Sequence, residues 1–217
     1  MTEQIKKILD LNRLAYDSVR QNFRIGMTEK DIKNLIAANC KCDEFAGDFV
    51  AGIRSGAIEG DATDYVLKKG DCLILDLQFC LDGIWTDTTR TFFIGEPSQE
   101  QLLAYNAVLQ AKSEAEKTLK NGTSAFDIHG AMVSGFGEYQ RYFPHHAGHR
   151  FGEQPFMQPQ FLPENTNVLE TGMTVTLEPG IYFENNFGIR VEDNYLITEN
   201  GFLNLFNYTT KIEDFVL

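Results

Sequence analysis

The segment DLQFCLDGIWTD, residues 76–87, constrains the fold more than any other part of the chain. From Cys72 to Leu81 an apolar Leu or Phe occupies every odd-numbered position, which predicts a β-strand with one apolar face. The dipeptide Asp82-Gly83 tolerates positive φ at both central positions of a tight turn. We therefore expect the chain to reverse there into a second strand, Ile84–Phe93, and to form an antiparallel hairpin.

The register of this hairpin would bring two carboxylates together. Pairing across the turn places Asp76 opposite Thr89 and, further along, Asp87 opposite Gln78. The two aspartates are then diagonal neighbours on one face, about 7–8 Å apart at the backbone. Carboxylates at that separation can hold a pair of cations about 3.5–4 Å apart. Two solvated carboxylates on an open sheet face are the alternative, and the hairpin alone leaves both open.

Two further carboxylates are expected on the polar faces of strands. In TVTLEPG, Glu178 shares a face with two threonines before Pro179 and Gly180 stop the strand. In GIRVEDN, Glu192 shares a face with Arg190. The chain thus offers four carboxylates in similar settings.

Histidines lie between these segments, in PHHAGHRFG. His145 and His149 are four residues apart, a spacing that would put both on one side of a helix. Pro144, Gly148 and Gly152 instead favour a loop or an irregular strand. The helical zinc-binding motif is therefore not indicated.

Taken in order, these segments resemble the pita-bread metallopeptidases, which comprise methionine aminopeptidase, Xaa-Pro aminopeptidase and prolidase, with creatinase as a metal-free relative. The resemblance runs through RIGMTEKDI, KKGDCLILDL, TDTTRTF, PHHAGHRFG, TLEPGIY and GIRVEDNYLIT. TDTTRTF and GIRVED are nearest to the Xaa-Pro aminopeptidase and prolidase branch. The resemblance implies an α+β fold in which curved antiparallel sheets are backed by helices, in two halves related by a pseudo-two-fold.

The resemblance also implies roles for individual residues. The five metal ligands would be Asp76, Asp87, His149, Glu178 and Glu192. Glu178 would in addition handle the proton of the attacking water, and His145 would stand near the substrate. Residues that support the ligands from behind would be Arg90, Arg190 and Tyr182.

Four carboxylates and one imidazole form a hard, oxygen-rich ligand set. Such a set suits two divalent metal ions, with manganese expected and cobalt, iron or zinc as alternatives. Divalent cations lower the pKa of a bound water towards about 7 and so supply a nucleophile at neutral pH. The expected substrate is a small peptide or a peptide-like amide.

The chain departs from the family at two substrate-contacting histidines. The position seven residues after His149 is Phe156, and the position seventeen residues before Asp76 is Glu59. A short deletion after Gly152 gives another alignment, but no histidine follows His149 in either case. Loss of one oxyanion donor typically costs about 10²–10³ in rate. The remaining histidines, His129 and His146, are expected to be structural.

Two classes of function stay open on this basis. The first is a dinuclear metal-dependent hydrolase of small peptides, similar to Xaa-Pro aminopeptidase or dipeptidase, with weak activity or altered specificity. The second is a pseudoenzyme that binds a partner in the pita-bread cleft, and a creatinase-like C–N hydrolase is a third reading. Retention of all five ligand types favours the first.

Length and composition fit this reading. With 217 residues, 43% of them hydrophobic, the chain can bury one core, and no Pro/Gly/Ser-rich linker divides it. We expect a single catalytic-type domain over residues 1–217, without a separate N-terminal domain. The net charge of −12 disfavours nucleic acid. No apolar run approaches the ~20 residues of a membrane span, and a cytoplasmic location is expected.

Cysteines, aromatic residues and helix signals complete the predictions. The four cysteines show no CxxC spacing and are expected to be reduced thiols. A homodimer is plausible through the aromatic residues of FLNLFNY; alternatively, these residues are part of the core of a strand.

Apolar periodicity predicts four helices, the second capped by Thr28. Their predicted ranges are Ile5–Arg20, Glu29–Ala38, Gln99–Leu119 and Ala125–Tyr139.

Overall fold

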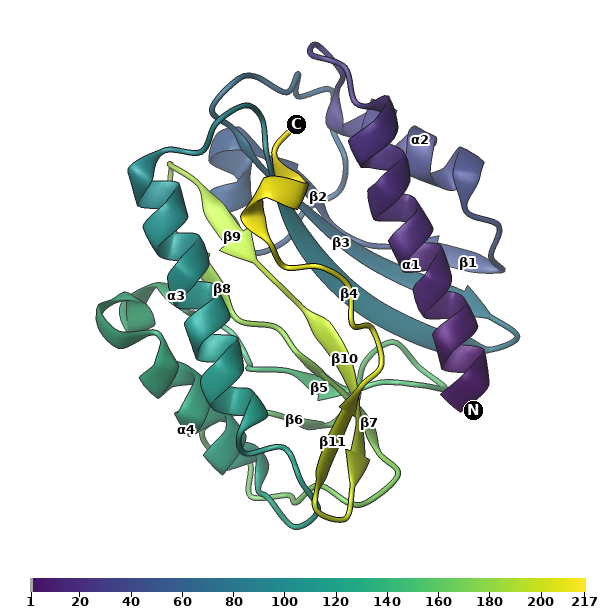
Figure 1. The fold of residues 1–217 in the computed structure, drawn as a ribbon, viewed down its shortest axis with the longest axis vertical. Helices are drawn as coiled ribbons and strands as arrows, with labels where there is room; N and C mark the ends of the chain where they lie inside the picture. The colour runs from purple at the N-terminus through teal and green to yellow at the C-terminus, as the bar shows by residue number, and fades with distance from the viewer. Residues whose placement is uncertain (1) are drawn as a thin grey trace.

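The computed structural model describes residues 2–217 as curved antiparallel sheets with helices packed on the outside (Figure 1). Helices α1 (Thr2–Asn22) and α2 (Glu29–Asn39) cover the sheet of the first half. Helices α3 (Gln99–Glu116) and α4 (Ala125–Gly135) pack together on the opposite side of the molecule. This arrangement confirms the predicted α+β pita-bread fold with two similar halves.

The predicted hairpin is present with the predicted register. Strands β3 (Cys72–Leu81) and β4 (Ile84–Phe93) pair along their whole length, with Asp76 opposite Thr89. At the turn, Asp82 and Gly83 have φ values of 52° and 73°. The odd-numbered apolar side chains of β3 are buried in the main core, except Leu81, which is partly buried and packs against it. The aspartate face therefore points away from that core.

The first half contains two more short strands. Strands β1 (Glu44–Ala46) and β2 (Phe49–Ala51) pair antiparallel with the free edge of β3. The 3₁₀ turn η1 (Gly52–Gly56) then opens a long loop that ends before β3.

A five-stranded antiparallel sheet, in the order β11-β10-β7-β5-β6, forms the second half. Its strands are β5 (His149–Arg150), β6 (Met157–Gln160), β7 (Thr174–Leu177), β10 (Asp193–Thr198) and β11 (Gly201–Asn204). Strands β8 (Gly180–Tyr182) and β9 (Gly188–Arg190) form a separate antiparallel pair. Strand β7 stops before Pro179-Gly180, as predicted, and Gly180 begins the new strand β8. An isolated bridge between Thr89 and Glu192 joins β4 to the segment before β10.

Helix ends differ from the predictions by a few residues. Thr28 caps α2, and its side chain and that of Asp31 bond to each other's backbone N–H. Helix α3 ends at Glu116, three residues earlier than predicted. Helix α4 ends at Gly135, because Gly137 adopts a φ of 58° and the chain continues as a 3₁₀ turn, η2 (Gly137–Tyr142).

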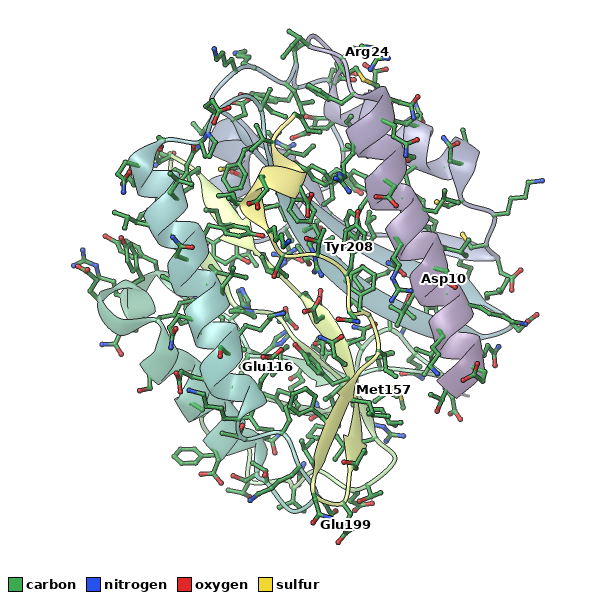
Figure 2. All side chains as sticks on the ribbon, in the orientation of Figure 1. Asp10, Arg24, Glu116, Met157, Glu199 and Tyr208 are labelled. Carbon is green, nitrogen blue, oxygen red and sulfur yellow. The ribbon has the colours of Figure 1, made fainter. Side chains whose placement is uncertain are left out.

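The C-terminal segment packs beneath α1. The Tyr208 hydroxyl donates to Asp17 of that helix at 2.6 Å, and Figure 2 shows Tyr208 beside it. Phe206 is fully buried and stacks on Tyr208. The aromatic residues of FLNLFNY thus belong mainly to the core. Leu203, in the same segment, is exposed. A last 3₁₀ turn, η3 (Ile212–Phe215), follows. All four cysteines are free thiols.

One buried carboxylate fixes the loop that leads to the candidate site. Glu29, at the start of α2, is fully buried and accepts hydrogen bonds from Ala51 N (2.8 Å) and Thr63 N (2.9 Å). It also pairs with Arg54 of η1. These bonds hold both ends of the loop 52–63 against one helix terminus.

Replacing this carboxylate is expected to destabilise the fold. Glu29→Ala removes the carboxylate partner of Arg54 and leaves the backbone N–H groups of Ala51 and Thr63 without an acceptor, at a cost of about 3 kcal/mol in the free energy of unfolding. Urea denaturation followed by circular dichroism measures this change. Glu3→Ala removes an exposed surface pair with Lys6 and should leave the urea midpoint in place. Equal midpoints for both variants would contradict the role given to Glu29.

Candidate metal centre

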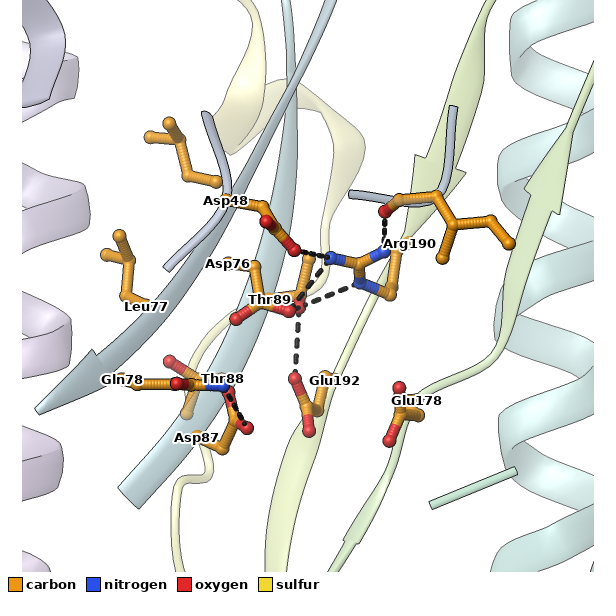
Figure 3. Close-up of polar contacts among 12 residues, drawn as sticks. Asp48, Asp76, Leu77, Gln78, Asp87, Thr88, Thr89, Glu178, Arg190 and Glu192 are labelled. Carbon is orange, nitrogen blue, oxygen red and sulfur yellow. Dashed lines mark hydrogen bonds and ion pairs between the residues drawn. The ribbon is translucent and has the colours of Figure 1, made fainter. Parts of the chain in front are cut away.

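The proposed ligands come from both halves of the molecule and meet at one pocket of about 360 Å³. Asp76 and Asp87 lie on β3 and β4, while Glu178 follows β7. Glu192 sits between β9 and β10, and His149 begins β5. Figure 3 shows the four carboxylates converging from these strands. Four of the five residues line the pocket; Glu192 lies behind them, almost fully buried.

Three of these residues could share one ion. Asp87, His149 and Glu192 each offer a ligand atom, and these atoms lie within 4.8 Å of one another. Glu178 Oε1 is 3.5 Å from His149 Nε2 and extends the cluster on one side. Asp76 extends it along the hairpin. The set has the donor atoms and the charge of a site for divalent cations.

The backbone around His149 explains its position. Gly148 has a φ of 152°, and a Cβ there would lie 2.2 Å from the Thr176 carbonyl oxygen. Only glycine lets this strand approach β7 so closely. His149 Nδ1 donates to the Arg150 carbonyl at 3.0 Å, which leaves Nε2 free. Nε2 lies 3.6 Å from Asp87 Oδ2, in the direction of the cluster.

The carboxylates carry more negative charge than the protein around them offsets. Asp76 Oδ1, Asp87 Oδ1 and Glu192 Oε1 are buried and have no hydrogen-bond partner among residues 2–217. Burial and the neighbouring carboxylates Asp76 and Glu178 raise the pKa of Asp87 well above its usual range. Burial and Asp87 raise the pKa of Glu192 in the same way. Bare oxygens aimed into one space are the ligands that divalent cations need, so these residues fit a metal centre.

Arg190 is the positively charged side chain that the protein itself places beside these carboxylates. Its guanidinium donates to Asp76 Oδ2 at 2.8 Å, and it lies 3.4 Å from Asp48 (Figure 3). It also donates to the Tyr182 hydroxyl at 2.8 Å and to Thr89 Oγ1 at 3.1 Å. Arg190 thus lies directly behind Asp76, and Tyr182 lies behind Arg190.

Arg90 supports the centre through the backbone instead. It lies on the core face of β4 and donates to the Glu192 carbonyl at 2.7 Å and to Asp193 Oδ1 at 2.6 Å. Lys112 of α3 pairs with the same aspartate. Burial opposes ionisation of Asp193, but Arg90 and Lys112 hold the pKa of that carboxyl well below its usual range. Sequence reasoning missed Lys112 and Asp193, although Asp193 follows Glu192 directly.

The two positions that lack the family histidines both lie at the pocket. Glu59 is exposed at its rim, on the loop that Glu29 anchors. The Phe156 ring lies 4.4 Å from the His149 ring, centroid to centroid, and remains 43% exposed. An acidic and an apolar side chain thus occupy places where imidazoles were expected from the resemblance.

His145 and His146 both line the pocket. Both nitrogens of His145 are occupied, because Nδ1 donates to the His146 carbonyl at 2.8 Å and Nε2 accepts from Tyr182 at 3.0 Å. Burial lowers the pKa of His145 to about 4. His146, expected to be structural, lines the pocket with Nδ1 3.1 Å from Glu178 Oε1. His129 lies on α4, with its ring against Phe143.

Two more pocket residues escaped sequence reasoning. Gln78 donates to Asp87 Oδ2 at 2.9 Å, and the predicted register already placed these residues opposite each other. Asp48 exchanges two backbone hydrogen bonds with Asp76. Nothing in the sequence around Asp48 signals this contact, since it depends on the pairing of β2 with β3.

The curved antiparallel fold, with carboxylates and a histidine converging in one pocket, is that of the pita-bread class. The profile of metallopeptidase family M24 matches residues 3–199, and the chain belongs to that family. None of the helices within residues 2–217 has the length and apolar character needed to cross a membrane.

Individual relatives support this assignment. An uncharacterized peptidase of Staphylococcus haemolyticus is 32% identical over 94% of this chain and 61% of its own length. The crystal structure of an X-Pro aminopeptidase from Thermotoga maritima superposes with a TM-score of 0.94 at 31% identity, covering 99% of this chain and 62% of the other. Prolidase from Pyrococcus furiosus gives a TM-score of 0.89 at 30% identity, covering 95% and 64%. The chain spans about three-fifths of the length of these relatives.

Removing the charge of Asp87 should raise the stability of the metal-free protein and weaken its metal binding. Asp87→Asn relieves repulsion between buried carboxylates, so the melting temperature of chelator-treated protein should rise. Manganese should stabilise the unchanged protein by about 2.7 kcal/mol at a hundredfold excess over Kd, and the variant by far less. Differential scanning calorimetry with and without manganese measures both effects.

Asp64→Asn serves as the control. The Asp64 side chain is exposed, so this variant should keep the full manganese-induced stabilisation. A manganese shift of equal size in Asp87→Asn and in the unchanged protein would exclude Asp87 as a ligand.

Proposed function

We propose that the protein is a dinuclear metal-dependent hydrolase of small peptides, of the Xaa-Pro aminopeptidase or dipeptidase type. The observation that carries the proposal is the set of three buried carboxylate oxygens without a partner, beside a histidine whose Nε2 is free. The solved proteins that this chain resembles include an X-Pro aminopeptidase, an Xaa-Pro dipeptidase and a prolidase. Their activity supports the substrate class.

In this proposal the five ligands are those that the resemblance implied, and the metal is manganese, with cobalt, iron or zinc as alternatives. Bound cations would supply a water acidic enough to react at neutral pH. Glu178 lies at the pocket, close to His149, where its carboxylate can receive the proton of the attacking water. Arg190 and Thr89 hold Asp76 in place through hydrogen bonds.

The pseudoenzyme remains the second candidate, since Phe156 and Glu59 replace two histidines. A pure binding module gains nothing from buried, mutually repelling carboxylates, whereas a metal centre requires them. This difference favours the hydrolase over the pseudoenzyme. A creatinase-like reaction would leave the same carboxylates unused. A cytoplasmic location and a homodimer stay predictions.

Hydrolysis of Xaa-Pro dipeptides tests the proposal. The protein with manganese should release proline from Ala-Pro, and chelation should stop the release. Glu178→Gln should lower kcat by about 10² or more, because the substitution removes the proton acceptor. Amino-acid analysis of the products gives the rate. Absence of turnover across a panel of dipeptides, with the metal site filled, would favour the pseudoenzyme.

Restoring the two histidines should raise this activity. The double change Glu59→His and Phe156→His places imidazoles at the pocket rim and beside His149, where they can stabilise a developing negative charge. We expect kcat for Ala-Pro to rise at least about tenfold, with KM changed less. The paired control is Glu199→His with Leu203→His, two exposed positions outside the pocket lining. An unchanged kcat in a folded, metal-loaded double variant would show that the pocket is built for a different substrate.

A further inference from the structure

Glu59 stands apart from the other acidic side chains of the pocket lining. In the proposed function, two divalent cations balance the four carboxylates of the metal centre. Asp48, which also lines the pocket outside that centre, lies 3.4 Å from the guanidinium of Arg190. Glu59 lines the same pocket but forms no ion pair and no side-chain hydrogen bond within residues 2–217. The described residues therefore leave one negative charge of the pocket unbalanced.

The cationic side chains around this loop are already engaged. Arg54, on the same loop, pairs with the buried carboxylate of Glu29 and donates to the Asp61 carbonyl at 3.1 Å. Arg190, the cationic side chain of the pocket lining, is buried and donates to Asp76 at 2.8 Å. A partner for the charge of Glu59 would thus come from a ligand.

The backbone before Glu59 is tied to the metal centre. Arg190 Nη1 donates to the Ile58 carbonyl at 2.7 Å, and Nη2 of the same guanidinium donates to Asp76 (Figure 3). One rigid, planar group therefore binds both a proposed metal ligand and the residue that precedes Glu59. The distance between the metal centre and Glu59 is fixed by this double contact.

Gly60 fixes the backbone on the other side of Glu59. Its N–H donates to Asp48 Oδ1 at 3.0 Å, and its carbonyl accepts from Phe49 N at 2.9 Å. A Cβ at this position would lie 3.0 Å from the Val50 side chain, so the loop packs closely against β2 here. The carboxylate of Glu59 is therefore attached to a backbone that is held on both sides.

Ile58 adds an apolar surface beside this charge. Its side chain lines the same pocket and is 37% exposed. Lysine and arginine carry an apolar stem that lies along apolar surface while the terminal charge meets its partner. The pair Ile58-Glu59 offers both contacts to such a side chain, whereas a neutral side chain would leave the carboxylate unpaired.

The proposed substrate class determines which substrate residue carries the cation. In an Xaa-Pro dipeptide the second residue is proline, which has no charge in its side chain, so the variable side chain belongs to the first residue. The free amino group is common to all such dipeptides and cannot distinguish them. We infer that Glu59 selects Xaa-Pro substrates whose first residue is lysine or arginine, by pairing with the cation of that side chain. The inference rests on the proposed peptidase function and names the residue that sets its specificity.

Kinetics with two matched dipeptides test the inference. Norleucyl-proline has an apolar side chain similar to the stem of lysine but lacks the ammonium group. With manganese at low salt, kcat/KM for lysyl-proline should exceed that for norleucyl-proline at least about fivefold, the factor that a favourable, partly exposed ion pair provides. The difference should lie in KM more than in kcat, because the pair forms in the ground state as well as in the transition state. Raising the salt concentration to about 0.5 M should reduce it through screening.

Three substitutions of Glu59 give results that a purely structural role would not produce. Glu59→Gln should reduce the ratio of the two kcat/KM values to about one. Glu59→Asp keeps a carboxylate and should retain part of the ratio, whereas Glu59→Lys should shift the preference to glutamyl-proline. The manganese-induced rise in melting temperature should be the same in all three variants, which separates a change in specificity from a lost metal centre.

Asp61→Asn is the matched control, because it removes the same charge two residues further along the loop. The Asp61 side chain is 92% exposed and lies outside the pocket lining, so this variant should keep the full preference for lysyl-proline. An equal loss of preference in Asp61→Asn and Glu59→Gln would assign the effect to the general surface charge and overturn the inference. A folded, manganese-binding Glu59→Gln variant that keeps the preference would also overturn it, while leaving the proposed function intact.

A binding measurement covers the case in which the protein cleaves neither dipeptide. Calorimetric titration of the manganese-loaded protein should give a Kd for lysyl-proline at least about fivefold below that for norleucyl-proline, and Glu59→Gln should remove the difference. This result would support the inference even if the hydrolase proposal failed. Equal Kd values, or binding of neither dipeptide, would overturn the inference.

Discussion

The mutual repulsion of four carboxylates held out of water is the constraint on which the rest of this structure depends. Asp76, Asp87, Glu178 and Glu192 are almost entirely buried around one pocket. Isolated charges in such a place would be costly, and they persist only where other groups compensate. The guanidinium of Arg190 provides part of this compensation at Asp76. Burial opposes ionisation of Glu178, but His146, His149 and His145 hold the pKa of that carboxyl below its usual range. Bound divalent cations would supply the compensation that Asp87 and Glu192 lack.

The fold can be understood as the means of holding these groups in place against that repulsion. A hairpin of two ten-residue strands fixes the two aspartates through backbone pairing, and the Thr89–Glu192 bridge connects it to the second half. On the far side of β4, Arg90 and Lys112 converge on Asp193 and so anchor the backbone next to Glu192. The ligands are therefore held by strands and loops that contacts outside the pocket fix in place, as a precise metal centre requires.

Local pattern predicted the parts of this arrangement that depend on neighbouring residues. The turn at Asp82-Gly83 and the alternation of β3 determine the register, so the placement of Asp76 and Asp87 followed from sequence. The cap at Thr28 was predictable for the same reason. Contacts between distant segments were not: Lys112 meets Asp193 across 81 residues, and Asp48 meets Arg190 across 142. The contact of His146 with Glu178 is of the same kind, since only the folded chain brings Glu178 to its ring.

The central claim is that the buried carboxylates exist to hold two divalent cations. The most direct test is to count manganese bound per chain by equilibrium dialysis and elemental analysis, starting from chelator-treated protein. The account predicts about two ions per chain, as expected for paired metals bridged by carboxylates. Protein that binds no manganese, cobalt, iron or zinc under these conditions would contradict it.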